Sequence, residues 1–93
     1  MSKKDAYIEK AQAQIEEQSA KLEQLKAKLK GETASIKIEG HKRIEKLESN
    51  LDAAKIRLAE IKDSAEDAWE DLTERFDNLA DDVGASVKKF LGK

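Results

Sequence analysis

Apolar residues recur along the first two thirds of the chain at intervals of three, four or seven positions. This spacing places them in a narrow stripe on one side of an α-helix, as in the seam of a coiled coil. From Ile8 to Ile36 every seventh residue is Ile or Leu, and a cleaner tract starts at Ile44. We predict that the seam, which is also the expected oligomer interface, consists of Ile8, Ile15, Leu22, Leu25, Leu29, Ile36, Ile44, Leu47, Leu51, Leu58 and Ile61.

The two tracts are out of phase, because eight residues separate Ile36 from Ile44 where seven would keep the register. The steps across this region follow an eleven-residue period, which locally unwinds a supercoil without ending the helix. The seam pattern also runs without interruption through Ser64. The pattern therefore favours a long continuous helix, and one that runs from Lys4 to Val83 would measure about 120 Å.

Other signals favour a chain that is broken into shorter helices. Gly31 follows three lysines, and glycine after a basic last turn is a helix stop signal. A helix start signal lies at Asp63-Ser64, with Asp67 three positions after the serine. Breaks at both places would give three helices of about 28 residues, each about 42 Å long. Of the two possible break sites, the one near residues 31–35 has the stronger signal.

The last third of the chain carries a broader and more aromatic apolar face. It consists of Trp69, Leu72, Phe76, Leu79, Val83, Val87, Phe90 and Leu91. The opposite side is acidic as far as Lys88, whereas binding to anionic lipid needs Lys and Arg along that side. We expect this face to close a bundle or to meet another subunit, with a membrane surface as the less favoured alternative. The chain is divided accordingly into a charged coiled-coil segment, 1–62, and an acidic amphipathic helical segment, 63–93.

The composition supports an all-α fold. The 93 residues include no Pro, and 38 of them are charged, with 18 Lys and Arg against 20 Asp and Glu. The chain is also rich in Ala, Lys, Glu, Gln and Leu, which lose the least entropy on helix formation. Only 23 residues are large and apolar, which is few for a compact core at this length. We expect an elongated coiled coil, as a long helix or a helical hairpin, with an amphipathic C-terminal segment.

Composition also bears on where the protein works. The chain has no Cys and no run of eighteen apolar residues, which excludes a disulfide framework and a transmembrane helix. The first residues are too few and too charged to form a signal peptide. We therefore expect a soluble cytoplasmic protein.

The charges are unevenly distributed. Residues 20–46 carry eight bases and four acids, net +4, whereas residues 60–82 carry ten acids and two bases, net −8. Antiparallel packing, in a hairpin or between two chains, would bring these blocks together about a midpoint near Asn50 and Leu51. We therefore expect a homo-oligomer, either an antiparallel dimer or a four-helix bundle, in which exposed ion pairs select the orientation and add little stability.

Candidate chemistry is sparse. His41 and Glu45 lie one helical turn apart, but one histidine with one carboxylate is poor evidence for a metal site. Carboxylate pairs at helical spacing abound, yet acid–base catalysis needs a cleft that shifts their pKa values. Basic residues alternate with acidic ones, so no continuous surface for nucleic acid is predicted. We expect no catalytic residues, no metal, no cofactor and no enzymatic activity.

Three stretches resemble a family of small bacterial coiled-coil proteins that are linked to stress response and described as apolipoprotein-like. They are the Lys/Glu/Gln/Ala-rich residues 7–30, the sequence IEKL at 44–47, and DAWEDL at 67–72 followed by an amphipathic tail that ends in Phe90. Gly31 and Gly40 depart from the helix-favouring residues that this pattern would have there. The resemblance implies a bacterial cytoplasmic setting and a stress-related role, and it implies no catalytic residue.

Two functions follow from these observations. The first is a non-enzymatic structural or interaction protein that self-associates through its helices. The second is an amphipathic lipid-surface or protective protein that becomes helical on membranes, because high charge and few aromatic residues are also typical of disordered chains.

Overall fold

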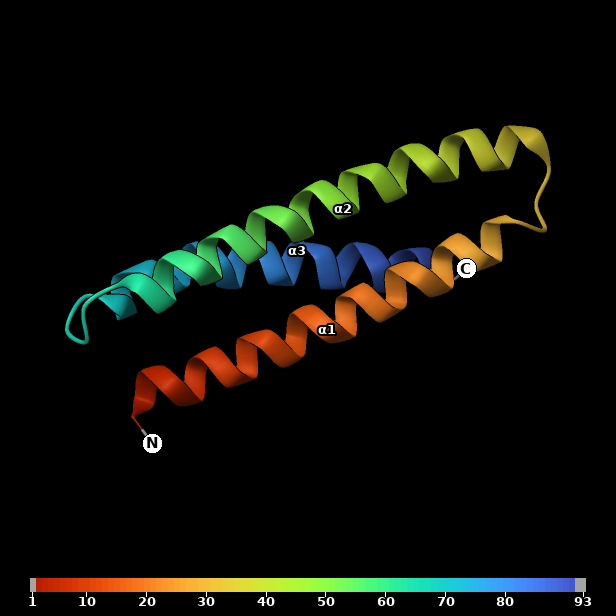
Figure 1. The fold of residues 1–93 in the computed structure, drawn as a ribbon. Helices are drawn as coiled ribbons and strands as arrows, with labels where there is room; N and C mark the ends of the chain where they lie inside the picture. Colours follow the sequence, from red (N-terminus) through yellow and green to blue (C-terminus); the bar gives the residue numbers. More distant parts are fainter. Residues whose placement is uncertain (1, 92–93) are drawn as a thin grey trace.

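The computed structural model describes residues 2–91, without the side chain of Leu91. It contains three α-helices, α1 (Lys3–Leu29), α2 (Ala34–Asp63) and α3 (Thr73–Leu91), and a short 3-10 helix, η1 (Trp69–Leu72), that precedes α3. Figure 1 shows α2 running antiparallel to α1, and α3 returning beside both of them. The bundle is 51 Å long and 19 by 17 Å across. The predicted all-α fold class is confirmed.

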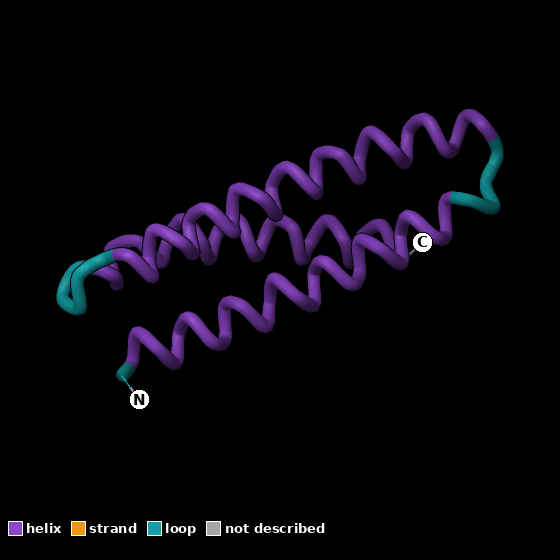
Figure 2. Tube along the Cα trace, viewed as in Figure 1, coloured by secondary structure: helices purple, strands orange, loops and turns teal. Residues whose placement is uncertain are grey.

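The helix is interrupted at both of the predicted break sites, near residues 31 and 64. The prediction of one continuous helix is therefore wrong. After α1 ends, the backbone N–H of Glu32 donates to the carbonyl of Leu29 at 3.0 Å, and α2 begins after Thr33. At the far end the hydroxyl of Ser64 donates to the carbonyl of Ile61 at 2.6 Å, and Ser64 has an extended backbone. Figure 2 shows the two connections at opposite ends of the bundle. Folding back covers the apolar stripe that a single helix would leave in water.

The interior consists of two apolar clusters that follow one another along the bundle axis. One contains Leu22, Leu25, Leu29, Ile44, Leu47, Leu51, Val83 and Val87, and the other contains Ala11, Ala54, Leu58, Ile61, Trp69, Phe76 and Ala80. Each cluster takes residues from all three segments of the bundle, and no charged side chain is buried among the described residues. The segments 1–62 and 63–93 therefore pack together around a shared interior.

Most of the predicted seam lies inside a single chain. Ile8 and Ile15 are half-buried and pack on the clusters, and the remaining residues up to Ile61 are buried, with one exception. The exception is Ile36, which is 50% exposed. Because α2 begins at Ala34, Ile36 lies in its first turn, at the end of the bundle. An oligomer built on this seam would require the bundle to open.

The apolar face of the last third closes the bundle. Trp69, Phe76, Val83 and Val87 are buried against α1 and α2, while Leu72, Leu79 and Phe90 are half-buried. The side chain of Leu91 lies outside the described residues. A partner or a membrane would meet this face only after α3 had left the other two helices.

Gly40 allows α1 and α2 to approach closely. A Cβ atom at this position would lie 2.5 and 2.8 Å from the two terminal methyl carbons of Leu29. Gly40 is itself buried in the interior of α2. A residue that weakens helix propensity is therefore used here for packing.

Candidate functional site

Folding back sorts the charges to opposite ends of the bundle. Residues 26–46 and 84–91, which we call the basic end, carry nine bases and three acids, net +6. Residues 2–10 and 60–82, which we call the acidic end, carry twelve acids and five bases, net −7. In Figure 1 the basic end contains the α1–α2 connection and the C-terminal part of α3, whereas the acidic end contains the α2–α3 connection.

The two charged blocks do not meet within the chain, in contrast to what antiparallel packing about Asn50 would give. Each block is folded about its own connection, since the helices break near residues 31 and 64. Among the described residues only one ion pair joins two helices, between Lys26 of α1 and Glu48 of α2 at 3.3 Å. The hydrogen bonds that the Lys26 ammonium donates to Glu23 and Glu48 raise the pKa of Lys26. Within one chain, the charge of each end is therefore not neutralised by the other end.

At the acidic end, polar contacts fix the start of α1 against the other helices. The ammonium group of Lys4 donates to the carbonyls of Lys62 and Ser64, at the C-terminus of α2, where a cation is favourable. The hydroxyl of Tyr7 donates to Oδ1 of Asp77 in α3 at 2.6 Å. Burial, and then this hydrogen bond, raise the pKa of Tyr7.

Three aromatic rings lie together beside these contacts. The centroid of the Tyr7 ring is 5.6 Å from that of Trp69 and 6.2 Å from that of Phe76 in an edge-on arrangement. Phe76 is fully buried and Trp69 nearly so. The acidic end is therefore a closed and packed structure with charges on its outside.

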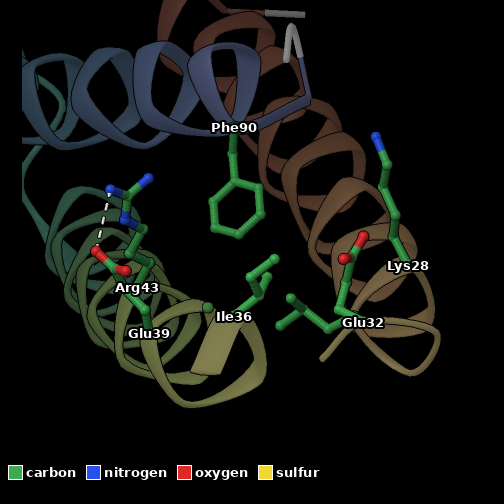
Figure 3. A pocket seen from close by; sticks show the side chains of 8 residues that line it. Lys28, Glu32, Ile36, Glu39, Arg43 and Phe90 are labelled. Atoms are coloured by element: carbon green, nitrogen blue, oxygen red, sulfur yellow. Dashed lines mark ion pairs between the residues drawn. The ribbon is translucent and has the colours of Figure 1, made fainter. Parts of the chain in front are cut away.

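The basic end is open in comparison. A groove of about 410 Å³ lies between the end of α1, the start of α2 and the last turns of α3. In Figure 3 the ring of Phe90 extends from α3 into this space towards Ile36 of α2. Arg43 pairs with Glu39 at 3.7 Å and places its guanidinium 5.9 Å from the centroid of the Phe90 ring, within cation–π range.

Exposed apolar and basic side chains meet at this end. Ile36 and Ile38 are 50% and 62% exposed, and Lys28 and Lys30 are exposed on the neighbouring last turn of α1. Lys28, Lys30 and Lys37 form no ion pair with any described acidic residue. This site was not predicted from the sequence, because Phe90, which lines the groove beside Ile36, comes from a distant segment of the chain. Its one signal was a pair of isoleucines in a lysine-rich region.

The pair of His41 and Glu45 lies in a different setting from the one a metal prefers. Both residues line a shallow groove together with Lys26, Lys30 and Lys37, whose charges oppose a bound cation. No group of three His, Cys, Asp or Glu side chains is arranged to hold a metal within residues 2–91.

Comparisons with family models, with curated proteins and with solved structures find no match to this chain. Within the described part of the chain, none of the helices has the length and apolar character needed to cross a membrane.

Proposed function

We propose that this is a non-enzymatic interaction protein that self-associates as an antiparallel pair of bundles. The observation that carries the proposal is the opposite charge of the two ends, net +6 at the basic end and −7 at the acidic end. Two copies placed antiparallel bring each basic end beside an acidic end. A parallel pair would place like charges together.

Area favours side-by-side contact over end-to-end contact. The long side of the bundle measures 51 by 19 Å, three times the area of an end, which measures 19 by 17 Å. Stable protein interfaces bury about 800 Å² on each partner, which an end cannot offer. An antiparallel side-by-side pair also closes on itself through a two-fold axis, whereas head-to-tail contacts produce open chains.

The outer side of α2 offers apolar residues for such a contact. Ile38 and Ile56 are 62% and 60% exposed, and they lie eighteen residues apart. Eighteen residues make five turns of an α-helix, so both side chains project from the same side. A two-fold axis at the level of Leu47, midway between them, sets Ile38 of each copy against Ile56 of the other. The same operation places Lys42 level with Asp52 of the second copy.

The pairing is expected to depend on salt. Each exposed ion pair contributes only about 0–1 kcal/mol, and charges are screened beyond about 8 Å at physiological ionic strength. The orientation is therefore electrostatic, while the contacts of Ile38 and Ile56 supply the apolar part. A bacterial cytoplasmic setting and a stress-related role belong to this proposal, and they rest on the sequence resemblance alone.

Light-scattering mass measured after gel filtration tests the proposal. At about 20 mM NaCl the mass should be twice the 10.4 kDa of one chain, and at about 500 mM NaCl it should fall towards one chain. Ile56→Asp should weaken the pair at least tenfold at low salt, because the carboxylate would face Ile38 of the second copy. Ile36→Asp is the matched control, since Ile36 is exposed but lies on another side of α2. A mass of 10.4 kDa at every salt concentration, or equal loss of pairing in both variants, would contradict the antiparallel pair.

A further inference from the structure

The tip of the basic end combines exposed apolar side chains with basic ones. Ile36 and Ile38 are exposed in the first two turns of α2, directly after the α1–α2 connection. Ile36 lines a groove together with Leu29 and Phe90, and Ile38 lies on a different side of α2. The most exposed apolar side chains at this end therefore lie near the end of the rod, with further apolar surface beside Ile36.

Basic side chains outnumber acidic ones at this tip, where Glu32 and Glu39 also line the groove and Glu39 pairs with Arg43. Lys28 and Lys30 lie on the last turn of α1 and Lys37 lies between the two isoleucines, and none of the three has an acidic partner among the described residues. Lys88 and Lys89 in the last turns of α3 add to the same field. From this arrangement we infer that the closed bundle binds an anionic lipid surface end-on, with Ile36 and Ile38 entering the interface and the lysines contacting the headgroups.

The size of the tip favours a lipid surface over a protein. An end of 19 by 17 Å is well below the area of a stable protein interface. A bilayer needs no such area, because binding grows with each inserted apolar side chain and with each nearby base. A Lys or Arg held close to an anionic leaflet strengthens binding by roughly fivefold. Nucleic acid would attract the same lysines, but it would gain nothing from the exposed isoleucines.

The inference goes beyond self-association, and the two compete. In an antiparallel pair the acidic end of the second copy lies beside the basic tip and offsets its charge. The lipid-bound form is therefore the single bundle. A variant that cannot pair should bind vesicles at least as tightly as the natural chain.

Vesicle co-sedimentation at about 50 mM NaCl tests the inference with two kinds of large vesicle, pure phosphatidylcholine and phosphatidylcholine with about 30% phosphatidylglycerol. The natural chain should bind the anionic vesicles, with at least tenfold weaker binding to the neutral ones. Ile36→Asp should reduce binding about tenfold or more. This substitution is tolerated by the fold because an acidic residue is favourable in the first turn of a helix. Lys30→Glu should reduce binding by about fivefold or more.

Ile56→Asp is the matched control, since it changes an equally exposed isoleucine about 30 Å from Ile36 along α2. It should bind anionic vesicles as tightly as the natural chain or more tightly, whatever its effect on pairing. Equal binding to both vesicle types would overturn the inference, as would Ile36→Asp binding like the natural chain. Binding to a DNA duplex that exceeds binding to the anionic vesicles and is unaffected by Ile36→Asp would assign the tip to nucleic acid instead. Far-UV circular dichroism of each variant verifies that the helices are intact.

Discussion

Gln18 offers the sharpest test of how the interior is packed. Its side-chain oxygen, Oε1, is buried and has no hydrogen-bond partner among residues 2–91. On α1 it occupies the seam row between two buried residues, Ala11 and Leu25. Its side chain packs against Gly84 of α3, where a Cβ atom would lie 3.1 Å from Nε2 of Gln18. The amide of Gln18 thus packs against α3 in a position where no described residue donates a hydrogen bond to its oxygen.

Gln18→Leu should stabilise the protein. A buried polar group without a partner costs about 1–3 kcal/mol, and leucine removes that cost while it adds apolar contacts to the cluster. The half-buried position of Gln18 reduces the gain, so we expect about 1–2 kcal/mol. For a domain of this size, each kcal/mol corresponds to about 4–8 °C in melting temperature.

Thermal and urea unfolding, followed by circular dichroism at 222 nm, would measure this gain. Gln24→Leu is the matched control, because Gln24 is exposed on the same helix and its replacement should change stability by less than about 0.5 kcal/mol. If Gln18→Leu melts at or below the natural chain, the amide has a partner in solution and the reasoning is refuted. Equal stabilisation by both substitutions would show an effect of helix propensity instead.

Three further results are expected. Gly40→Ala should change stability by less than about 1 kcal/mol, because the terminal methyls of Leu29, 2.5–2.8 Å from the new Cβ, must move and this offsets the gain in helix propensity. Gly31→Ala, which meets no atom within 4 Å, should instead stabilise by about 0.4–1 kcal/mol, and urea unfolding would compare the two. Since the pKa of Tyr7 is raised in the folded chain, its contribution is fully present below the ordinary tyrosine pKa near 10 and is lost as pH rises above it. The melting temperature should therefore fall more steeply above pH 10 in the natural chain than in Tyr7→Phe, and parallel curves would contradict the role of the Asp77 hydrogen bond.

The helices and most of the interior residues could be predicted from the sequence, but the connections between the helices could not. The rows from Leu22 to Leu29 and from Ile44 to Ile61 were read correctly as buried, because a narrow stripe must be covered whatever covers it. The seam phase through Ser64 pointed to a continuous helix. Phase is a poor guide there, since a seam that continues in register is compatible with a turn as well as with a straight helix.

The candidate site was less accessible to sequence reasoning. The basic tip joins Lys28 and Ile36, which flank the α1–α2 connection, with Phe90, which reaches them only after a second reversal of direction. From the sequence, binding to anionic lipid is disfavoured, because the polar side of the C-terminal helix is acidic. In the structure the last turns of α3 lie beside the lysine-rich end of α1 instead, so the charge that a membrane would meet comes from another helix.

The account depends most on the return of α3, which places Lys30 and Lys89 at the same end of the bundle. Because the chain has no cysteine, spin labels can be attached through Lys30→Cys and Lys89→Cys and their separation measured by pulsed electron paramagnetic resonance, with unlabelled chain in excess. Lys89 lies beside Arg43 and Lys46, a few turns of α2 from the α1–α2 connection, so the predicted separation combines the width of the bundle with this offset. We predict a separation well below the 51 Å length of the bundle, extended only by the label linkers. A separation approaching about 89 Å, the length of 59 residues of uninterrupted helix, would contradict the folded-back bundle and the charged ends that follow from it.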